Sequence, residues 1–130
     1  MEAGMTFFLV EDHETVDSHL WVVLSDPHRF PDQVVIVSVT TLKDYKDQAC
    51  TLKRGVHPCI THASCIAYNM AKVVTLEKLL QCKDAGLIVP QEPVSPALLE
   101  RIRNRAGDST LMAPDVADIL IEQGIINLDD

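Results

Sequence analysis

The residues best suited to chemistry lie close together in one stretch, from Asp47 to Tyr68. This stretch holds two histidines, three cysteines, a hydroxyl and a phenol: His57, His62, Cys50, Cys59, Cys65, Ser64 and Tyr68. Imidazole accepts and releases protons near neutral pH, hydroxyls donate hydrogen bonds, and histidine and cysteine ligate metals. Because polar groups of this kind contribute little to a small core, their concentration in one segment indicates a site.

Alternation within the segment predicts how these groups are presented. If residues 59–68 form a strand, successive side chains point to opposite faces of a sheet. The small residues would then pack inward, and His62, Ser64 and Tyr68 would share an exposed surface. The alternative for these residues is ordinary hydrogen bonding within a folded strand. For His57, which precedes a proline, the alternative is a turn histidine bonded to backbone.

The cysteines do not predict a metal centre. None of the four forms a CxxC pair, so we expect free and mostly buried thiols. Two weaker alternatives remain, a mixed set of His57, Cys59, His62 and Cys65, and a histidine pair of His13 and His19. The first set has neither strand geometry nor zinc spacing, and the second needs ligands from elsewhere. We therefore expect no metal and no other cofactor.

The chain carries a formal net charge of −8, which limits the classes of ligand it can hold. Broad nonspecific binding of nucleic acid depends on neutralising phosphates and is disfavoured by this charge. The positive charges nevertheless cluster in the sequence, at Lys43, Lys46, Lys53 and Arg54. Such a cluster is compatible with local phosphate contacts, and a solvated surface is the alternative.

Length and hydropathy predict one domain in the cytoplasm. The chain has 130 residues, 47% of them apolar, which is enough for a core. It has no apolar run of about 18 residues, so we expect no membrane span. The N-terminus has a short apolar patch followed by acids, whereas a secretory signal needs a basic start and a longer apolar run.

The first half of the chain predicts short strands. Continuous apolar runs rich in β-branched residues occupy Thr6–Val10, Leu20–Ser25 and Val34–Thr40. Runs without alternation are typical of strands buried on both faces or in the wall of a barrel. Cys50–Leu52 and Ala71–Val74 predict two further short strands.

The second half predicts helices. Leu76 begins apolar residues at helical spacing, and a glycine follows as a stop. Ser95 and Pro96 form a strong helix start, a capping hydroxyl followed by proline at the first helical position. Pro114 opens a third helix. Between the first two helices, Pro90 and the nearby prolines predict a connector without regular structure.

The strand half resembles the small toxins of bacterial toxin–antitoxin systems, the MazF/PemK-like group. The resemblance covers roughly residues 5–75, and its matching pieces are HLWVVLSDP, which ends at Pro27, VVIVSVTT over 34–41, and DQACTLKRGVHPCITHASCIAY over 47–68. It implies a divergent member with an α+β fold that is mainly β: a small SH3-like barrel at 1–75 and a helical extension at 76–130, packed as one compact domain. It also implies cleavage of single-stranded RNA without a metal, a possible homodimer, and inhibition by an antitoxin protein.

Site roles follow from the resemblance and from the chemistry of RNA cleavage. Attack of a ribose 2′-OH on the adjacent phosphate needs a base, an acid and a donor for the developing charge. By position, Thr40 or Thr41 matches the hydroxyl after the family's central strand. The histidine variant that we expect uses His62 as base or acid, with the other catalytic side chains as its partner and donors: His57, Ser64 and Tyr68.

The expected RNA contacts are the cations. The family's arginine lies in the loop after its first strand and has no match here, because Arg29 comes one loop later. The RNA-binding residues that we expect are Arg29, Lys43, Lys46, Lys53 and Arg54. A second hypothesis, favoured by the acidic charge, is a noncatalytic protein-interaction module that keeps the barrel and has lost the chemistry.

Overall fold

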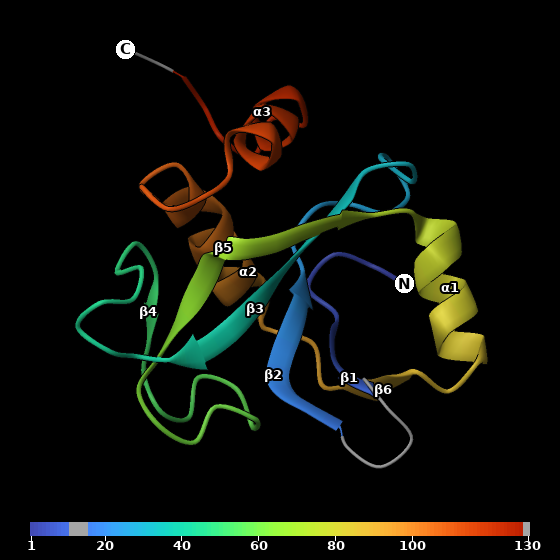
Figure 1. Cartoon of the computed structure of the whole chain (residues 1–130), viewed down its shortest axis with the longest axis horizontal. Coiled ribbons are helices and arrows are strands. Elements are labelled where there is room, and N and C mark those ends of the chain that lie inside the picture. Colours follow the sequence, from blue (N-terminus) through green and yellow to red (C-terminus); the bar gives the residue numbers. More distant parts are fainter. Residues whose placement is uncertain (11–15, 129–130) are drawn as a thin grey trace.

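The computed structural model describes residues 1–10 and 16–128, with side chains described for 1–10 and 19–128. Its strands are β1 (Thr6–Val10), β2 (Val16–Val23), β3 (Val34–Thr41), β4 (Thr51–Leu52), β5 (Ser64–Val74) and β6 (Ile88–Gln91). Its helices are α1 (Leu76–Asp84), α2 (Pro96–Ala106) and α3 (Pro114–Glu122). The protein is therefore α+β, as the sequence predicted (Figure 1). None of the helices in the described ranges is long and apolar enough to cross a membrane.

The strands form one antiparallel sheet in the order β4-β5-β3-β2-β1-β6. The order has two ends, β4 and β6, and the sheet is not closed into a barrel by any pairing within the described part of the chain. The predicted SH3-like barrel is therefore wrong for this sheet. A barrel encloses its core on one face of its strands, whereas this sheet buries apolar residues on both faces, under helices.

The two faces of the sheet bury different parts of the chain. On one face α2 and α3 pack through Ile102 and Leu120 against alternate residues of β2, β3 and β5. On the other face α1 packs Leu79 against Trp21 and Val34, together with β1 and β6. Figure 1 shows α2 and α3 together and α1 apart from them, at the far end of β5. The apolar cluster on the α1 side includes Val34 and Ile36 at the start of β3 but no residue from the end of that strand.

Strand β3 shows why the apolar runs have no alternation. Six residues in succession, 34–39, are buried: Val35, Val37 and Val39 lie in the cluster under α2 and α3, and Val34 and Ile36 lie in the cluster with α1. Burial on both faces was one of the two alternatives that the sequence offered for this run, and the wall of a barrel was the other. The predicted bounds for β1 agree with the structure, and those for β3 differ by one residue. The run at 71–74 is the end of β5 rather than a separate strand.

Helix starts follow the predicted capping chemistry. The Ser95 hydroxyl accepts a hydrogen bond from the Leu98 amide at 3.1 Å, and Pro96 is the first residue of α2. Thr75 caps α1 in the same way, through a 3.0 Å bond from the Lys78 amide. Pro114 begins α3, as expected. These contacts satisfy amides that a helix leaves unbonded in its first turn.

One predicted connector is a strand. Residues Ile88–Gln91 form β6, which pairs with β1 at the end of the sheet. Pro90 is compatible with this position because an edge strand needs only one of its two sides for hydrogen bonding, and proline lacks the amide hydrogen. The prolines therefore predicted a connector without regular structure, and the structure has an edge strand there.

Candidate functional site

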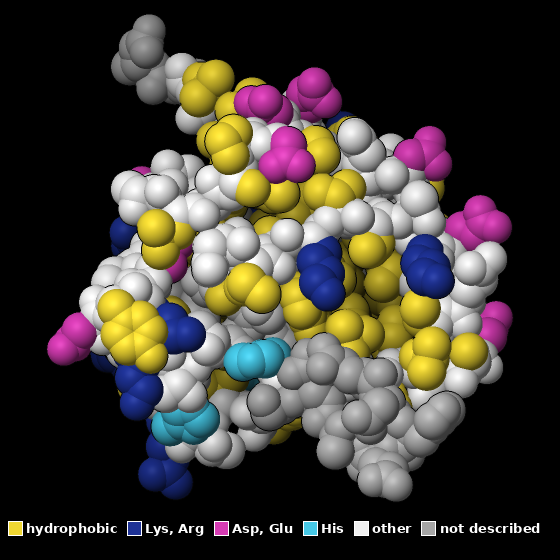
Figure 2. All heavy atoms as spheres, viewed as in Figure 1, with side chains coloured by type: hydrophobic (Ala, Val, Ile, Leu, Met, Phe, Trp, Pro, Cys, Tyr) yellow, Lys and Arg dark blue, Asp and Glu magenta, His cyan; other side chains and the backbone are white. Residues whose placement is uncertain are grey.

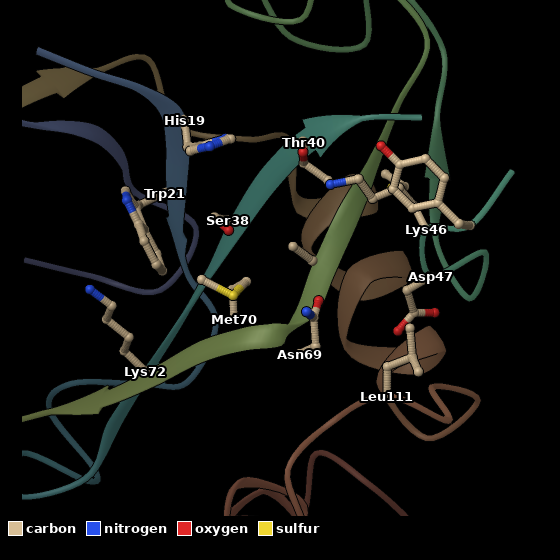
Figure 3. Close-up of a pocket in the computed structure, with 13 residues that line it drawn as sticks. His19, Trp21, Ser38, Thr40, Lys46, Asp47, Asn69, Met70, Lys72 and Leu111 are labelled. Atoms are coloured by element: carbon tan, nitrogen blue, oxygen red, sulfur yellow. The ribbon is translucent and has the colours of Figure 1, made fainter. Parts of the chain in front are cut away.

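A hollow lies on the face of the sheet that α1 leaves open, beyond the buried part of β2, β3 and β5. We call it the sheet-face hollow, and its volume is about 650 Å³. Figure 3 shows its lining residues projecting from the three strands and from the segment that follows β3. The polar and aromatic members of the lining are His19, Trp21, Ser38, Thr40, Tyr45, Lys46, Asp47, Asn69 and Lys72.

The hollow exists because small side chains occupy the middle strands. In the cross-strand register Trp21 pairs with Ser38, and Ser38 pairs with Ala67. In the next row on this face Thr40 pairs with Cys65. Small residues in β3 and β5 beside the large ring of Trp21 leave a depression that no helix fills.

Two lysines bring positive charge to the hollow. The Lys72 ammonium lies 5.1 Å from the centre of the Trp21 ring, and the Lys46 ammonium lies 5.6 Å from the centre of the Tyr45 ring. Both distances are typical of cation–π contacts. Figure 3 shows Lys72 and Lys46 on opposite sides of the hollow, with Ser38 and Met70 between them. An elongated ligand with anionic groups can therefore meet a cation at each side.

Asp47, the carboxylate in the lining, has a structural role. It is buried, and its two oxygens accept hydrogen bonds from the Ser109 hydroxyl at 2.5 Å and the Ala49 amide at 2.9 Å. These bonds connect the segment after β3 to the segment between α2 and α3. Among the described residues Asp47 is the one acidic side chain in the lining, and its carboxylate oxygens are engaged with hydrogen-bond donors.

Positive charge also gathers outside the hollow. Figure 2 shows several Lys and Arg side chains at the lower left, around β4 and its flanking segments, and two more near the middle of the face, while most of the acidic side chains lie along the upper and right edge. Lys43, Lys53 and Arg54 are exposed, and Lys46 is partly exposed and lines the hollow. The net charge of −8 is therefore unevenly spread over this face of the molecule.

Arg29 lies apart from these lysines. It lines a second depression between α2, the segment after β2 and the end of α3, which we call the α2 crevice. Its guanidinium stacks on Phe30 at 5.1 Å. Arg29 is therefore not in the sheet-face hollow, and the five expected RNA contacts do not form one surface.

His62 is exposed at the end of β3 and is paired with Thr41. Its Nε2 lies 2.9 Å from the Thr41 hydroxyl, and its Nδ1 lies 3.4 Å from the Thr61 hydroxyl. Thr41 follows Thr40 in β3, so the two side chains leave opposite faces of the sheet, and neither Thr41 nor His62 is among the residues that line the hollow. The partner predicted for His62 was His57, and in the structure the imidazole of His62 is paired with Thr41 instead.

His57 is buried, and the backbone uses both of its ring nitrogens. Nδ1 accepts a hydrogen bond from the Cys59 amide at 3.0 Å, so Nε2 carries the hydrogen that it donates to the Glu92 carbonyl. This arrangement ties the turn before β5 to the segment before α2. It matches the alternative of a turn histidine bonded to backbone and leaves no nitrogen for a partnership with His62.

The common surface predicted for His62, Ser64 and Tyr68 is wrong. β5 begins at Ser64, so His62 lies in the preceding turn. Ser64 is buried and donates to the His62 carbonyl at 2.9 Å. Tyr68 is fully buried and donates its phenol hydrogen to the Ile102 carbonyl of α2 at 2.6 Å. Ile66 and Tyr68 pack under the helices, and the small residues Cys65 and Ala67 line the hollow.

Burial controls the ionisation of the groups under and beside the sheet. Burial raises the pKa of the Tyr68 phenol far above its ordinary value, and the Cys50 thiol beside it acts in the same direction. Burial also raises the pKa of the thiols of Cys50, Cys59 and Cys65. A thiol is nucleophilic only as the thiolate, so these cysteines are protected from reaction at neutral pH.

No three histidine, cysteine or acidic side chains of the described residues are placed to hold a metal ion. The four cysteines are unpaired, and Cys50 and Cys65 are buried. The mixed set considered from the sequence includes His57, whose nitrogens the backbone uses. Of the histidine pair, His13 lies outside the described residues, and the Nδ1 of His19 is 3.3 Å from the Val39 carbonyl.

Sequence reasoning missed most of the hollow. Trp21 is buried, but one side of its ring meets Lys72. Asn69, Met70 and Lys72 follow directly after the buried residues of β5. The available signal was this change from apolar to polar residues within one strand, which marks the point where the helices stop covering the sheet.

In comparisons with known proteins, the chain matches no family model, no curated protein and no solved structure.

Proposed function

We propose that the protein binds single-stranded RNA at the sheet-face hollow and cleaves it without a metal, as a toxin-like endoribonuclease. The observations that carry the proposal are the exposed His62 paired with Thr41, and a hollow that presents two lysines and the exposed ring of Tyr45. Cations meet phosphates, and an exposed aromatic ring stacks on an unpaired base, so the hollow suits single-stranded RNA better than a duplex.

In the proposed reaction His62 accepts the proton of the ribose 2′-OH. The 2′-oxygen then forms a bond to the adjacent phosphorus, and the bond from phosphorus to the 5′-oxygen of the next nucleotide breaks. The leaving oxygen takes a proton from water, which gives a 2′,3′-cyclic phosphate and a 5′-hydroxyl. Thr41 orients the imidazole, and Lys46 stabilises the charge that develops on the phosphate oxygens.

The remaining parts of the proposal come from the resemblance to the toxin family. The protein works in the cytoplasm as a homodimer, and an antitoxin protein inhibits it. Free thiols fit a reducing compartment, and four are present. The chemistry does not depend on a closed barrel, because the hollow and the His62–Thr41 pair lie on an open sheet.

The first test is cleavage of a mixed-sequence single-stranded RNA in EDTA. We expect His62→Ala to lower the rate by roughly 10²–10⁴-fold, the usual contribution of general acid–base catalysis. His28→Ala is the matched control, since His28 is exposed and lies outside the hollow. A 2′,3′-cyclic phosphate end in the product shows that the 2′-OH is the nucleophile, and loss of cutting in His62→Ala purified in the same way separates this protein from a contaminating nuclease. Equal cutting by wild type and His62→Ala contradicts the assignment.

A noncatalytic protein-interaction module is the second candidate function. The observation in its favour is that His57, Ser64 and Tyr68 all serve the fold, which leaves one of the expected catalytic imidazoles. This candidate predicts no cutting of any RNA by wild type. The sole tryptophan, Trp21, lines the hollow, so quenching of its fluorescence by uncleaved RNA separates RNA binding without catalysis from no RNA binding at all.

A further inference from the structure

The α2 crevice holds two polar groups whose bonding is incomplete. Its volume is about 580 Å³, and it lies apart from the sheet-face hollow, with no lining residue in common. Arg103 of α2 and Gln123 at the end of α3 both line it. Neither residue belongs to the proposed RNA site.

Arg103 presents a guanidinium that the fold uses only in part. Its Nε donates to the Leu24 carbonyl at 2.8 Å, which fixes the plane of the group. Among the described residues no partner within bonding distance is found for its two terminal nitrogens. Burial lowers the pKa of this guanidinium, with Asp26 acting in the opposite direction. A half-buried cation with unused donors in a fixed plane is suited to a carboxylate, which accepts two parallel bonds.

Gln123 supplies an acceptor in the same crevice. Its side chain is 8% exposed, and its Nε2 donates to the Gln33 carbonyl at 2.6 Å. A carbonyl can only accept, so the amide cannot be turned the other way round. The Oε1 is buried and has no hydrogen-bond partner within the described ranges. Buried acceptors are nearly always paired, so this oxygen points to a missing N–H or O–H donor.

The charges around the crevice limit the ligand to a singly charged one. Arg29 and Arg103 are balanced by Asp26 and Glu100, which also line it. A chain of phosphates would meet both carboxylates and be repelled, whereas one carboxylate can reach the arginines. The wall also holds the apolar side chains of Phe30, Leu99 and Ile125, which suit a small apolar group.

We propose that the α2 crevice binds a carboxylate flanked by an N–H donor and an apolar side chain, the chemistry of a peptide carboxyl terminus. The carboxylate pairs with the free nitrogens of Arg103 and with Arg29. The last peptide N–H donates to Gln123 Oε1, and the terminal side chain rests against Leu99. A free amino acid shares this chemistry, except that an ammonium replaces the peptide N–H.

The test uses N-acetyl-Gly-Leu, which has the carboxylate, the peptide N–H and the apolar side chain in one fragment. It is titrated to about 10 mM into the full ¹⁵N-labelled chain, because fragments of this size bind weakly. We expect shifts in the Arg103 Nε–H, the Gln123 side-chain amide and the backbone around residues 123–127. The same fragment with a carboxamide terminus should bind at least about tenfold more weakly, since a charge-assisted pair is lost.

Variants separate the crevice from general effects. Arg29→Ala and Arg103→Lys should each weaken binding by roughly tenfold, the latter because an ammonium cannot form the parallel bonds. Arg101→Ala on the same helix is the matched control, since Arg101 does not line the crevice. Arg29 is exposed, so its variant keeps the test valid even if Arg103→Lys fails to fold.

Each remaining result decides the proposal. No shifts at the highest concentration, or equal shifts with the carboxamide, overturn it. Equal shifts with inorganic phosphate indicate a general anion site and overturn the peptide assignment. If free leucine binds more tightly than the acetylated fragment, the ligand of the crevice is a free amino acid, and the assignment to a peptide terminus is overturned. RNA cleavage is unaffected by all of these outcomes, so this inference and the proposed function fail separately.

Discussion

The face of the sheet under α2 and α3 and the face that carries the sheet-face hollow are built from the same strands, and a register shift between β3 and β5 separates the buried start of β5 from its exposed end. In β5 the residues Ile66 and Tyr68 are fully buried against the helices, while Asn69 and Lys72 are exposed at the hollow. The covered face uses its polar groups for the fold, as the phenol of Tyr68 does. The open face keeps cations and amides available to a ligand. A polar residue in a strand is therefore informative about function only when the covering of its face is known.

The largest effect should come from the covered face. Ile102 of α2 is fully buried against the sheet. Ile102→Ala should therefore lower the free energy of unfolding by about 2–5 kcal/mol, because it loses buried apolar surface and leaves a cavity. Met70→Ala on the open face, where Met70 is 54% exposed, should change it by less than about 0.5 kcal/mol. Urea denaturation of both variants measures the contrast. Similar losses at the two positions would break the comparison between the faces.

Alkaline pH should reveal the buried phenol. The pKa of Tyr68 is raised in the folded chain, so the native state holds this proton more tightly than the unfolded state does. The contribution to stability is complete below the ordinary tyrosine pKa and is lost as pH rises above it. Between pH 10 and 11 wild type should lose about 1 kcal/mol more than Tyr68→Phe does. The difference between the two proteins cancels the other titrating groups, and parallel pH profiles would contradict the assignment.

The phenol hydrogen bond should have a smaller effect at neutral pH. Tyr68→Phe removes the 2.6 Å bond to the Ile102 carbonyl and keeps the ring, so we expect a loss of about 0.5–1.5 kcal/mol. Thermal or urea unfolding at pH 7 measures it. RNA cleavage by the folded variant should be unchanged, because Tyr68 has no access to the hollow. If Tyr68→Phe is stable but does not cleave RNA, Tyr68 has a role in the reaction and the structural assignment is wrong.

The lysines of the open face should affect binding and not folding. In a His62→Ala background, which keeps the RNA intact, Lys46→Ala or Lys72→Ala should reduce the salt dependence of binding by about one phosphate contact. Lys78→Ala on α1 is the control, since Lys78 is exposed and does not line the hollow. Stability should stay within about 0.5 kcal/mol in all three. Equal effects of Lys78→Ala and Lys72→Ala would show that overall charge, rather than the hollow, governs binding.

The sequence predicted local features better than their placement. Capping by Ser95 and the run at Val34–Thr40 depend on neighbouring residues, and both agree with the structure. The strand at 88–91 was missed, because whether proline ends a strand or sits at an edge depends on which strands are its neighbours. For the site, the sequence paired His62 with His57, whereas the structure pairs it with Thr41, which lies outside the 47–68 segment. The contributions of Trp21 and Lys72 arise from separate strands and have no common sequence signal.

By itself the sequence determined where the chain can form strands and helices, that no CxxC pair is available, and that His62 stands in a segment rich in polar groups. Tertiary structure alone decided which of those groups meet solvent. The parity of a strand separates its two faces but does not say which one a helix will cover. Here α2 covers Tyr68, the backbone binds His57, and the strip that α1 leaves open becomes the hollow. The physical reason is that burial is a property of packed elements, and packing joins residues that lie far apart in the chain.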